Sequence, residues 1–352
     1  MFLLTLITII LIVYIIEQNS IKNALKGIEY TQNTSLTLVE PNEEFDIVCI
    51  LQNRTRRFVA FLRLKEKFSK EIELFLKNSE KFDNNILESS HYLMPRQKLE
   101  RRFRASIPKR GRYFLYGATI FGGDFLGISE TIGDYSCIEE VVAIPKESKL
   151  PDIEIKLSGY IGDISINRFI FEDPILTAGF NDYTGQEPQK MISWVQTARV
   201  GHLMVKKYDY TLELIVTVLL NIDYNGDNNE ELVEECFSIG RSVCQFLESK
   251  NIKYRFITNA TIAGTRPIWA NSDYGWGKNY LMNILEGLGR AVYIVREPYE
   301  KMLDRALNIA ELGVGHILIT PKMEESYLAG KDKLKELTGY DVCMLTPNQG
   351  GE

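Results

Sequence analysis

The sequence has few of the side chains that build metal or nucleophilic sites. Its three histidines, His91, His202 and His316, lie far apart, so there is no H-E-x-x-H motif and a histidine-based triad or zinc site is not expected. The five cysteines are odd in number, scattered and without a C-x-x-C pair, which predicts reduced, buried thiols. These absences argue against a zinc enzyme and against a fold built on disulfides.

Motifs for nucleotide binding and acyl transfer are also missing. The sequence contains no Walker loop, no G-x-G-x-x-G and no G-x-S-x-G elbow. Adjacent carboxylates such as Glu234 and Glu235 point about 100° apart on a helix, so they predict surface charge instead of acid–base catalysis. We therefore expect no catalytic residues and no cofactor. A hydrolase whose triad assembles only in space stays open as a less favoured alternative.

The charge balance gives no drive toward nucleic acid. The formal net charge is -6, whereas nucleic-acid binders carry a basic excess. At 352 residues the chain exceeds what one hydrophobic core usually supports, so more than one domain is expected. We predict an α+β multidomain protein with no nucleic-acid partner.

A long apolar run is present near the start of the chain. Residues Phe2 to Ile16 read FLLTLITIILIVYII, with only Thr5 and Thr8 polar apart from the Tyr14 hydroxyl. This predicts a transmembrane anchor over 1–21 that contacts membrane lipid. A cleaved signal peptide is the alternative, but it requires a basic n-region and a small-residue cleavage site, which are not seen here.

Two lysines set the expected orientation of this span. Lys22 and Lys26 follow the apolar run, and lysine and arginine collect on the cytoplasmic side of membrane helices. We expect a single-pass protein of the cell membrane with its body in the cytoplasm.

Residues 28–146 show short β-rich runs separated by turns. Alternation at period two, as in PNEEFDIVCILQN, is typical of a β-sandwich, here expected to be immunoglobulin-like. The stretch from Lys65 to Phe82 is ambiguous, because it also fits an amphipathic helix.

The stretch RQKLERRFRA predicts a strand with one charged face. One face carries Arg96, Lys98, Glu100, Arg102 and Arg104, and the other carries Gln97, Leu99, Arg101, Phe103 and Ala105. With Lys109, Arg110 and Arg112 the charged face makes a basic patch that could contact anionic headgroups. A solvated strand face is the favoured alternative.

Residues 208–346 alternate apolar strands with amphipathic helices, which is typical of a doubly wound parallel sheet. The expected strands are LELIVTVLLNID, KYRFITNATI, AVYIV, GHILIT and DVCML, and the expected helices are 229–250, 280–289, 299–312 and 324–337.

Three stretches carry a resemblance to a known family. They are KRGRYFLYG (Lys109–Gly117), GGDFLG (Gly122–Gly127) and FNDYTGQEPQKMISWVQTARVGHLMVKKYD (Phe180–Asp209). The last is the most specific and matches the family signature at Tyr183, Gly185, Ile192, Trp194, Ala198, Arg199, Leu203 and Val205. The chain resembles the bacterial family called domain of unknown function fifty-eight. It departs from the pattern at Asn181, Gln186 and Phe125, where arginine, aspartate and proline are usual.

The resemblance implies a β-sandwich, a connecting segment over 147–207 that carries the signature, and a von Willebrand A-like domain over 208–346. It also implies a possible partner, a MoxR-type AAA+ ATPase. Within the signature, Pro188 can begin a short helix that places Trp194 and Ala198 one turn apart. Tyr183, Gly185, Trp194, Ala198 and Arg199 are the candidate site, either as the joint between the domains or as a docking surface; the joint is favoured.

Von Willebrand A domains hold Mg²⁺ with D-x-S-x-S after their first strand. Here the corresponding residues read Asn221-Ile222-Asp223-Tyr224-Asn225, which lacks both hydroxyls and displaces the aspartate. NIDYNGDNNEEL also imitates a calcium loop, but its twelfth position is Leu232. Asn221, Asp223 and Asn225 are thus a degenerate metal site, and a polar turn is the favoured interpretation.

These observations predict a membrane-anchored, non-catalytic adaptor or scaffold, with a MoxR-type ATPase as a possible partner in envelope or complex assembly. A metal-dependent ligand-binding protein of the von Willebrand A type is the main alternative.

Overall fold

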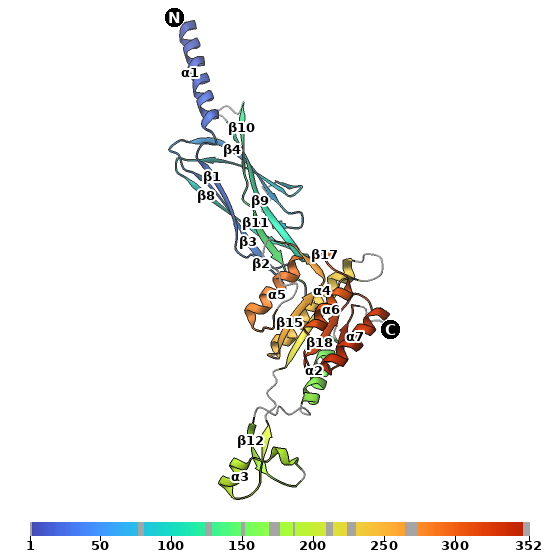
Figure 1. Ribbon diagram of the computed structural model, residues 1–352. Coiled ribbons are helices and arrows are strands. Elements are labelled where there is room, and N and C mark those ends of the chain that lie inside the picture. Colours follow the sequence, from blue (N-terminus) through green and yellow to red (C-terminus); the bar gives the residue numbers. More distant parts are fainter. Residues whose placement is uncertain are drawn as a thin grey trace. The chain divides into compact units, whose positions relative to one another are not determined.

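The computed structural model describes residues 2–76, 81–123, 129–148, 152–168, 177–185, 187–208, 214–223, 230–264 and 273–347 (Figure 1). The chain divides into two compact units. The first contains Met1–Lys146 together with Leu288–Arg290, and the second contains Glu147–Gly287 and Ala291–Glu352.

The first unit begins with the helix α1 (Phe2–Asn23), which continues beyond the apolar run through the mostly polar residues 17–23. The side-chain amide of Asn23 donates to the carbonyl of Asn19 at 2.7 Å and to its Oδ1 at 2.8 Å in the last turn. The chain then turns through Gly27, whose positive φ of 73° suits glycine, and enters β1 (Ile28–Thr34).

Two β-sheets follow, and they pack face to face. The first has the order β1, β3 (Phe45–Asn53), β8 (Lys98–Ser106), β5 (Glu73–Phe75). The second has the order β2 (Leu38–Val39), β11 (Glu139–Ala143), β9 (Gly111–Gly123), β4 (Val59–Phe68), β7 (Ile86–Leu93), β6 (Lys81–Asp83), with β10 (Glu130–Tyr135) also paired to β9. Side chains from both sheets share one core, including Ile47, Leu51, Leu64, Phe103 and Leu115. The predicted β-sandwich is confirmed.

The described part of the ambiguous stretch from Lys65 to Phe82 is strand wherever it has regular structure. β4 continues to Phe68, and β5 and β6 lie in the same stretch. The helical alternative is wrong, because β4 lies between β7 and β9 and its backbone groups pair with both neighbours.

The predicted alternation of β8 is present, but the basic patch is not continuous. Arg102 and Arg104 are exposed and pair with Glu100 and Glu44. Arg110 is buried, and Arg112 pairs with Glu140. Glutamates neutralise much of the charge, as the solvated-face alternative predicts, so this surface is a weak candidate for contact with anionic headgroups.

The second unit contains a parallel sheet with the order β15 (Lys253–Thr258), β14 (Ile215–Leu220), β18 (Gly315–Ile319), β19 (Val342–Leu345). The helices are α2 (Ile153–Arg168), α4 (Glu230–Ser249), α5 (Lys278–Arg290), α6 (Tyr299–Asn308) and α7 (Glu325–Thr338).

Helices cover both faces of this sheet. Leu219, Ile257 and Leu318 form one core with α6 and α7. The alternate residues Val218 and Ile317 are buried toward the other face, and α4 contacts β14, β15 and β18. The α/β architecture predicted from the sequence is therefore present.

The strand predicted at AVYIV is placed differently. β17 (Ala291–Val295) pairs antiparallel with β16 (Ala260–Ile262), outside the parallel sheet. Its side chains Tyr293, Ile294 and Val295 are exposed, so this apolar run is not buried on both faces as a central parallel strand would be.

The signature segment forms a small structure of its own. β12 (Thr177–Asp182) and β13 (Met204–Tyr208) pair antiparallel, and between them lie the 3₁₀ helix η1 (Gln189–Met191) and α3 (Trp194–Val200). Pro188 immediately precedes η1, as predicted for a helix start. We call residues 180–208 the signature module.

Candidate functional site

Polar side chains gather where β14 and β18 end, at the carboxyl edge of the parallel sheet. Asn221 follows β14, Asn259 follows β15 and Thr320 follows β18, and all three are fully buried. This edge is where open α/β sheets usually bind ligands, and it contains the degenerate metal motif.

The Asn221 side chain has no capacity left for a ligand. Its Nδ2 donates to the carbonyl of Asp223 at 2.6 Å and to Oγ1 of Thr320 at 3.1 Å. Its Oδ1 accepts from the Asp223 N–H at 2.9 Å and from Nδ2 of Asn259 at 2.7 Å. An amide offers two donors and two acceptor positions, and all four are used.

Asp223 connects this network to α6 and α7. Its Oδ2 accepts from the backbone N–H of Tyr299 at 3.1 Å, at the first residue of α6, and its carbonyl accepts from the Tyr327 hydroxyl at 2.7 Å. A carboxylate at a helix start satisfies an otherwise unpaired N–H and complements the helix dipole. Burial raises the pKa of Tyr327 to about 12, so its hydroxyl remains a donor at neutral pH.

The network is thus a structural joint between the ends of β14, β15, β18 and the start of α6. A cation would have to displace hydrogen bonds from Asn221 and compete with the N–H of Tyr299 for Asp223. Among the residues that the structure describes, no three His, Cys, Asp or Glu side chains are grouped to hold a metal ion. The third candidate, Asn225, lies outside the described residues.

Sequence reasoning found Asn221 and Asp223 but missed Asn259 and Thr320. Both stand at or just after the end of an expected apolar strand, in KYRFITN and GHILIT. A polar residue at the carboxyl end of a parallel strand was the available signal.

Backbone pairing holds the signature module together. The N–H of Tyr183 donates to the carbonyl of Leu203 at 2.9 Å, and Ile192 bridges to Val205. Ser193 caps α3 through a bond from the N–H of Gln196, and Gly201 ends it with φ 84°. Gly185 has φ 90°, which explains a glycine there. Tyr183 and Gly185 therefore serve the local fold of this module.

The remaining signature residues face outward. Trp194 is 68% exposed, and Ala198 and Arg199 on the same helix are exposed as well. Four further large apolar side chains of the same module are also exposed, namely Phe180, Val195, Val200 and Leu203. We call these five apolar side chains, Trp194 included, the tryptophan face. Several large exposed apolar side chains in one small module, a tryptophan among them, are typical of contact surfaces.

The helix α1 is the one described helix that is long and apolar enough to cross a membrane. The side chains described between Leu6 and Ile16, such as Ile9, Ile12 and Tyr14, are 41 to 62% exposed wherever they are large and apolar. A signal sequence near an N-terminus has the same properties.

A scan against protein-family models gives no match, and a search of curated proteins gives none either. Solved structures that resemble the chain are β-sandwich domains. They include the CARDB domain of a Pyrococcus furiosus protein (11% identity, 33% of this chain and 87% of that chain, TM-score 0.24) and a non-cellulosomal cohesin from Archaeoglobus fulgidus (11%, 33% and 91%, TM-score 0.24). A type II cohesin domain from the cellulosome of Acetivibrio cellulolyticus is similar at 13% identity, over 32% of this chain and 94% of that chain, with a TM-score of 0.26. Likenesses at this level do not assign a function.

Proposed function

We propose that the chain is a membrane-anchored, non-catalytic adaptor that binds a partner protein through the signature module. The observation that carries the anchor is the exposure of the large apolar side chains described between Leu6 and Ile16 of α1. Such a surface is costly in water, at roughly 25 cal/mol per Å² of apolar area, and is stable in lipid. The second unit, which contains the signature module, supplies the folded surface for a partner.

The length of α1 fits a bilayer. The helix contains 22 residues, which at about 1.5 Å per residue gives roughly 33 Å, close to the ~30 Å hydrocarbon core. Its polar last turn and Lys22 would then lie at the headgroup level, with Lys22 and Lys26 favouring a cytoplasmic body.

Membrane insertion is tested by alkaline carbonate extraction of cells that express the full chain. The chain should stay in the membrane pellet. The double variant Ile9→Lys/Ile12→Lys places two charges in the apolar run, each costing about 2.5 to 3.5 kcal/mol at the helix centre, and should release the chain. Gln18→Lys, beyond the run, is the matched control and should stay in the pellet.

A C-terminal reporter decides the orientation. A reporter that works only in the cytoplasm should be active, and a cysteine label applied outside intact cells should not reach the C-terminal region. Labelling from outside would contradict the cytoplasmic body and leave the anchor intact.

The partner implied by the family resemblance is a MoxR-type AAA+ ATPase. Cross-linking in native membranes followed by capture of the full chain should recover that ATPase. The Trp194→Ala variant should lose it, whereas a substitution outside the tryptophan face, Asn251→Asp, should retain it. Recovery of the ATPase with both variants would show that the signature module is not the binding surface. Failure to recover the ATPase with the wild-type chain would contradict the proposed partner.

A further inference from the structure

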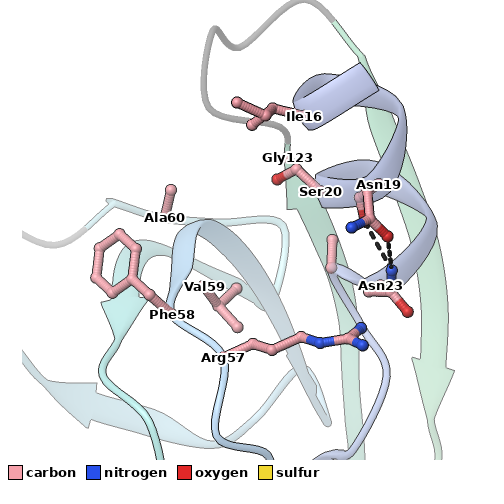
Figure 2. A pocket seen from close by; sticks show the side chains of 10 residues that line it. Ile16, Asn19, Ser20, Asn23, Arg57, Phe58, Val59, Ala60 and Gly123 are labelled. Carbon is pink, nitrogen blue, oxygen red and sulfur yellow. Dashed lines mark hydrogen bonds between the residues drawn. The ribbon is translucent and has the colours of Figure 1, made fainter. Parts of the chain in front are cut away.

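A pocket of about 220 Å³ lies between the last turns of α1 and the adjoining end of the β-sandwich, within the first unit (Figure 2). One side consists of α1 residues, and the other consists of the loop before β4 and the end of β9. The lining residues are Ile16, Asn19, Ser20, Asn23, Ala24, Arg57, Phe58, Val59, Ala60 and Gly123.

A single stripe of α1 faces the pocket. Ile16, Asn19, Ser20 and Asn23 follow the spacing of residues that share one helix face. Beyond Ile16, toward the C-terminal end of α1, this stripe is polar. The hydrogen bonds from Asn23 to Asn19 hold the two side-chain amides in place (Figure 2). The pocket thus passes from apolar to hydrogen-bonding side chains along the helix.

One cation lines this pocket, and three more stand close to its lining residues in the sequence. Arg57 lines it and extends toward Asn23 in Figure 2, and Arg56 precedes it in the same loop. Lys22 in the last turn of α1 and Lys26 just after it are exposed. Within the described residues, none of these four makes an ion pair. Nearby Arg54, in contrast, pairs with Glu29 at 2.8 Å.

The acidic residue on this part of α1 is Glu17. It is half-buried, it does not line the pocket, and its Oε2 has no hydrogen-bond partner among the residues that the structure describes. The sequence at the base of α1 is therefore predominantly basic, with Arg57 lining the pocket and Glu17, the carboxylate of this part of α1, outside it.

An aromatic pair borders the same loop. Phe58, which lines the pocket, is 43% exposed, and Tyr92 is 61% exposed, with ring centroids 6.3 Å apart. Tyr92 has the apolar ring and polar tip that are enriched at the headgroup level of membranes, whereas Phe58 adds apolar area beside it.

We propose that this pocket binds the phosphate of an anionic phospholipid in the leaflet that faces the body of the protein. The apolar run of α1 ends at Ile16, where the pocket begins, so a membrane-inserted α1 puts the pocket at the headgroup level. The planar guanidinium of Arg57 suits two phosphate oxygens, and Ser20 offers a hydroxyl. The inference rests on the membrane anchor in the proposed function.

The test uses the full chain in a neutral detergent, with native mass spectrometry to count bound lipids. Phosphatidylglycerol should bind in preference to phosphatidylcholine. The double variant Arg56→Gln/Arg57→Gln should weaken phosphatidylglycerol binding by more than tenfold, at about fivefold per cation, and leave phosphatidylcholine binding unchanged. The matched control is Arg102→Gln, an exposed arginine of the same sandwich, and it should bind like wild type.

Three results would overturn the inference. One is equal binding of the two lipids by wild type, and another is the same loss in the Arg102→Gln control. The third is binding of free glycerol phosphate as tight as that of the lipid, which would indicate a site for a soluble phosphate. A thermal midpoint equal to wild type verifies that the arginine variants are folded.

Carbonate extraction of cells that express the same chains separates this inference from the proposed function. A chain that inserts but shows no preference for the anionic lipid would contradict only the headgroup site. A chain that does not insert would contradict both the membrane anchor and the headgroup site.

Discussion

Arg101 and Glu66 form an ion pair inside the β-sandwich, with 2.8 Å between Nη1 and Oε2. The Glu66 side chain is fully buried and that of Arg101 is 10% exposed. Arg101 lies on β8 of one sheet and Glu66 on β4 of the other, so the pair crosses the core. The Tyr30 hydroxyl donates to the second carboxylate oxygen at 2.9 Å. Burial, together with Glu66, raises the pKa of Tyr30 far above its usual value, which keeps this donor protonated.

We expect Arg101→Met to destabilise the sandwich by about 3 to 5 kcal/mol, because it leaves the Glu66 carboxylate buried without its charge partner. The double variant Arg101→Met/Glu66→Gln should recover much of that loss, since no charge then remains in the core. Urea unfolding of the full chain in neutral detergent measures both. Arg102→Met, exposed on the same strand, should change stability by less than about 0.5 kcal/mol. A small effect of Arg101→Met would contradict the buried pair.

Asn221→Asp should destabilise the α/β unit by at least about 2 kcal/mol. The new carboxylate oxygen would face the carbonyl of Asp223, to which the Asn221 amide now donates at 2.6 Å, and would place a charge in a fully buried site. The thermal midpoint of the full chain is the measurement. Asn251→Asp, at an exposed turn residue, is the matched control and should melt like wild type.

Divalent ions should leave the unfolding midpoint unchanged. Asn221 has no free hydrogen-bonding position, and Asp223 already accepts from Tyr299. A ligand specific to the folded state would add about 2.7 kcal/mol at a hundredfold excess over its dissociation constant. The full chain is therefore melted in EDTA and in millimolar Mg²⁺, Mn²⁺ or Ca²⁺. A metal-dependent rise that Asp223→Ala abolishes would restore the metal-dependent binder as the better function.

His316 should make stability depend on pH. The residue is 2% exposed, and burial lowers its pKa to about 4, with repulsion from Arg255 acting in the same direction. The unfolded chain takes up a proton near the ordinary value of about 6.5, whereas the folded chain stays neutral, so stability falls as pH drops from about 6.5 toward 4. The loss is roughly 3 kcal/mol by pH 4.

This dependence is measured as the difference between wild type and His316→Gln in unfolding free energy at pH 7 and pH 4. Other groups titrate in both proteins, so their contribution cancels. Wild type should lose more than the variant. The exposed His202, replaced by glutamine, serves as control and should keep the wild-type slope. Equal slopes for wild type and His316→Gln would rule out a buried neutral histidine.

Trp194→Ala and Arg199→Ala distinguish the two roles predicted for the signature. Because both side chains are exposed, we expect each variant to melt within about 0.5 kcal/mol of wild type and to lose the captured partner. Ile192→Ala, in the buried part of the same module, is the contrasting variant and should destabilise it. A large loss of stability in Trp194→Ala would instead support the domain joint.

Local patterns in the sequence were sufficient to predict which segments are helices or strands and which of their faces are buried. Alternation at period two placed Phe103 and Ala105 of β8 inside and Arg102 and Arg104 outside, because strand side chains point to opposite faces in turn. The buried stripe of α4, which includes Cys236 and Val243, likewise follows the 3.6-residue period of an amphipathic helix. Both patterns depend only on neighbours along the chain.

Which side chains and strands pair with one another depends on the tertiary structure. The pattern put Arg101 on the inward face, but Glu66, its partner 35 residues away, became visible only when β8 and β4 packed together. Asn221 and Thr320 are 99 residues apart and meet because parallel strands bring their carboxyl ends to one edge. The run AVYIV pairs antiparallel with β16 and lies outside the parallel sheet. Its apolar content alone did not indicate which strand it would pair with. Local periodicity was enough to predict the apolar helix, the sandwich pattern and the βα alternation. Which polar groups satisfy one another, and the position of Arg57 beside the last turns of α1, depend on contacts between segments distant in sequence and became visible only in the folded chain.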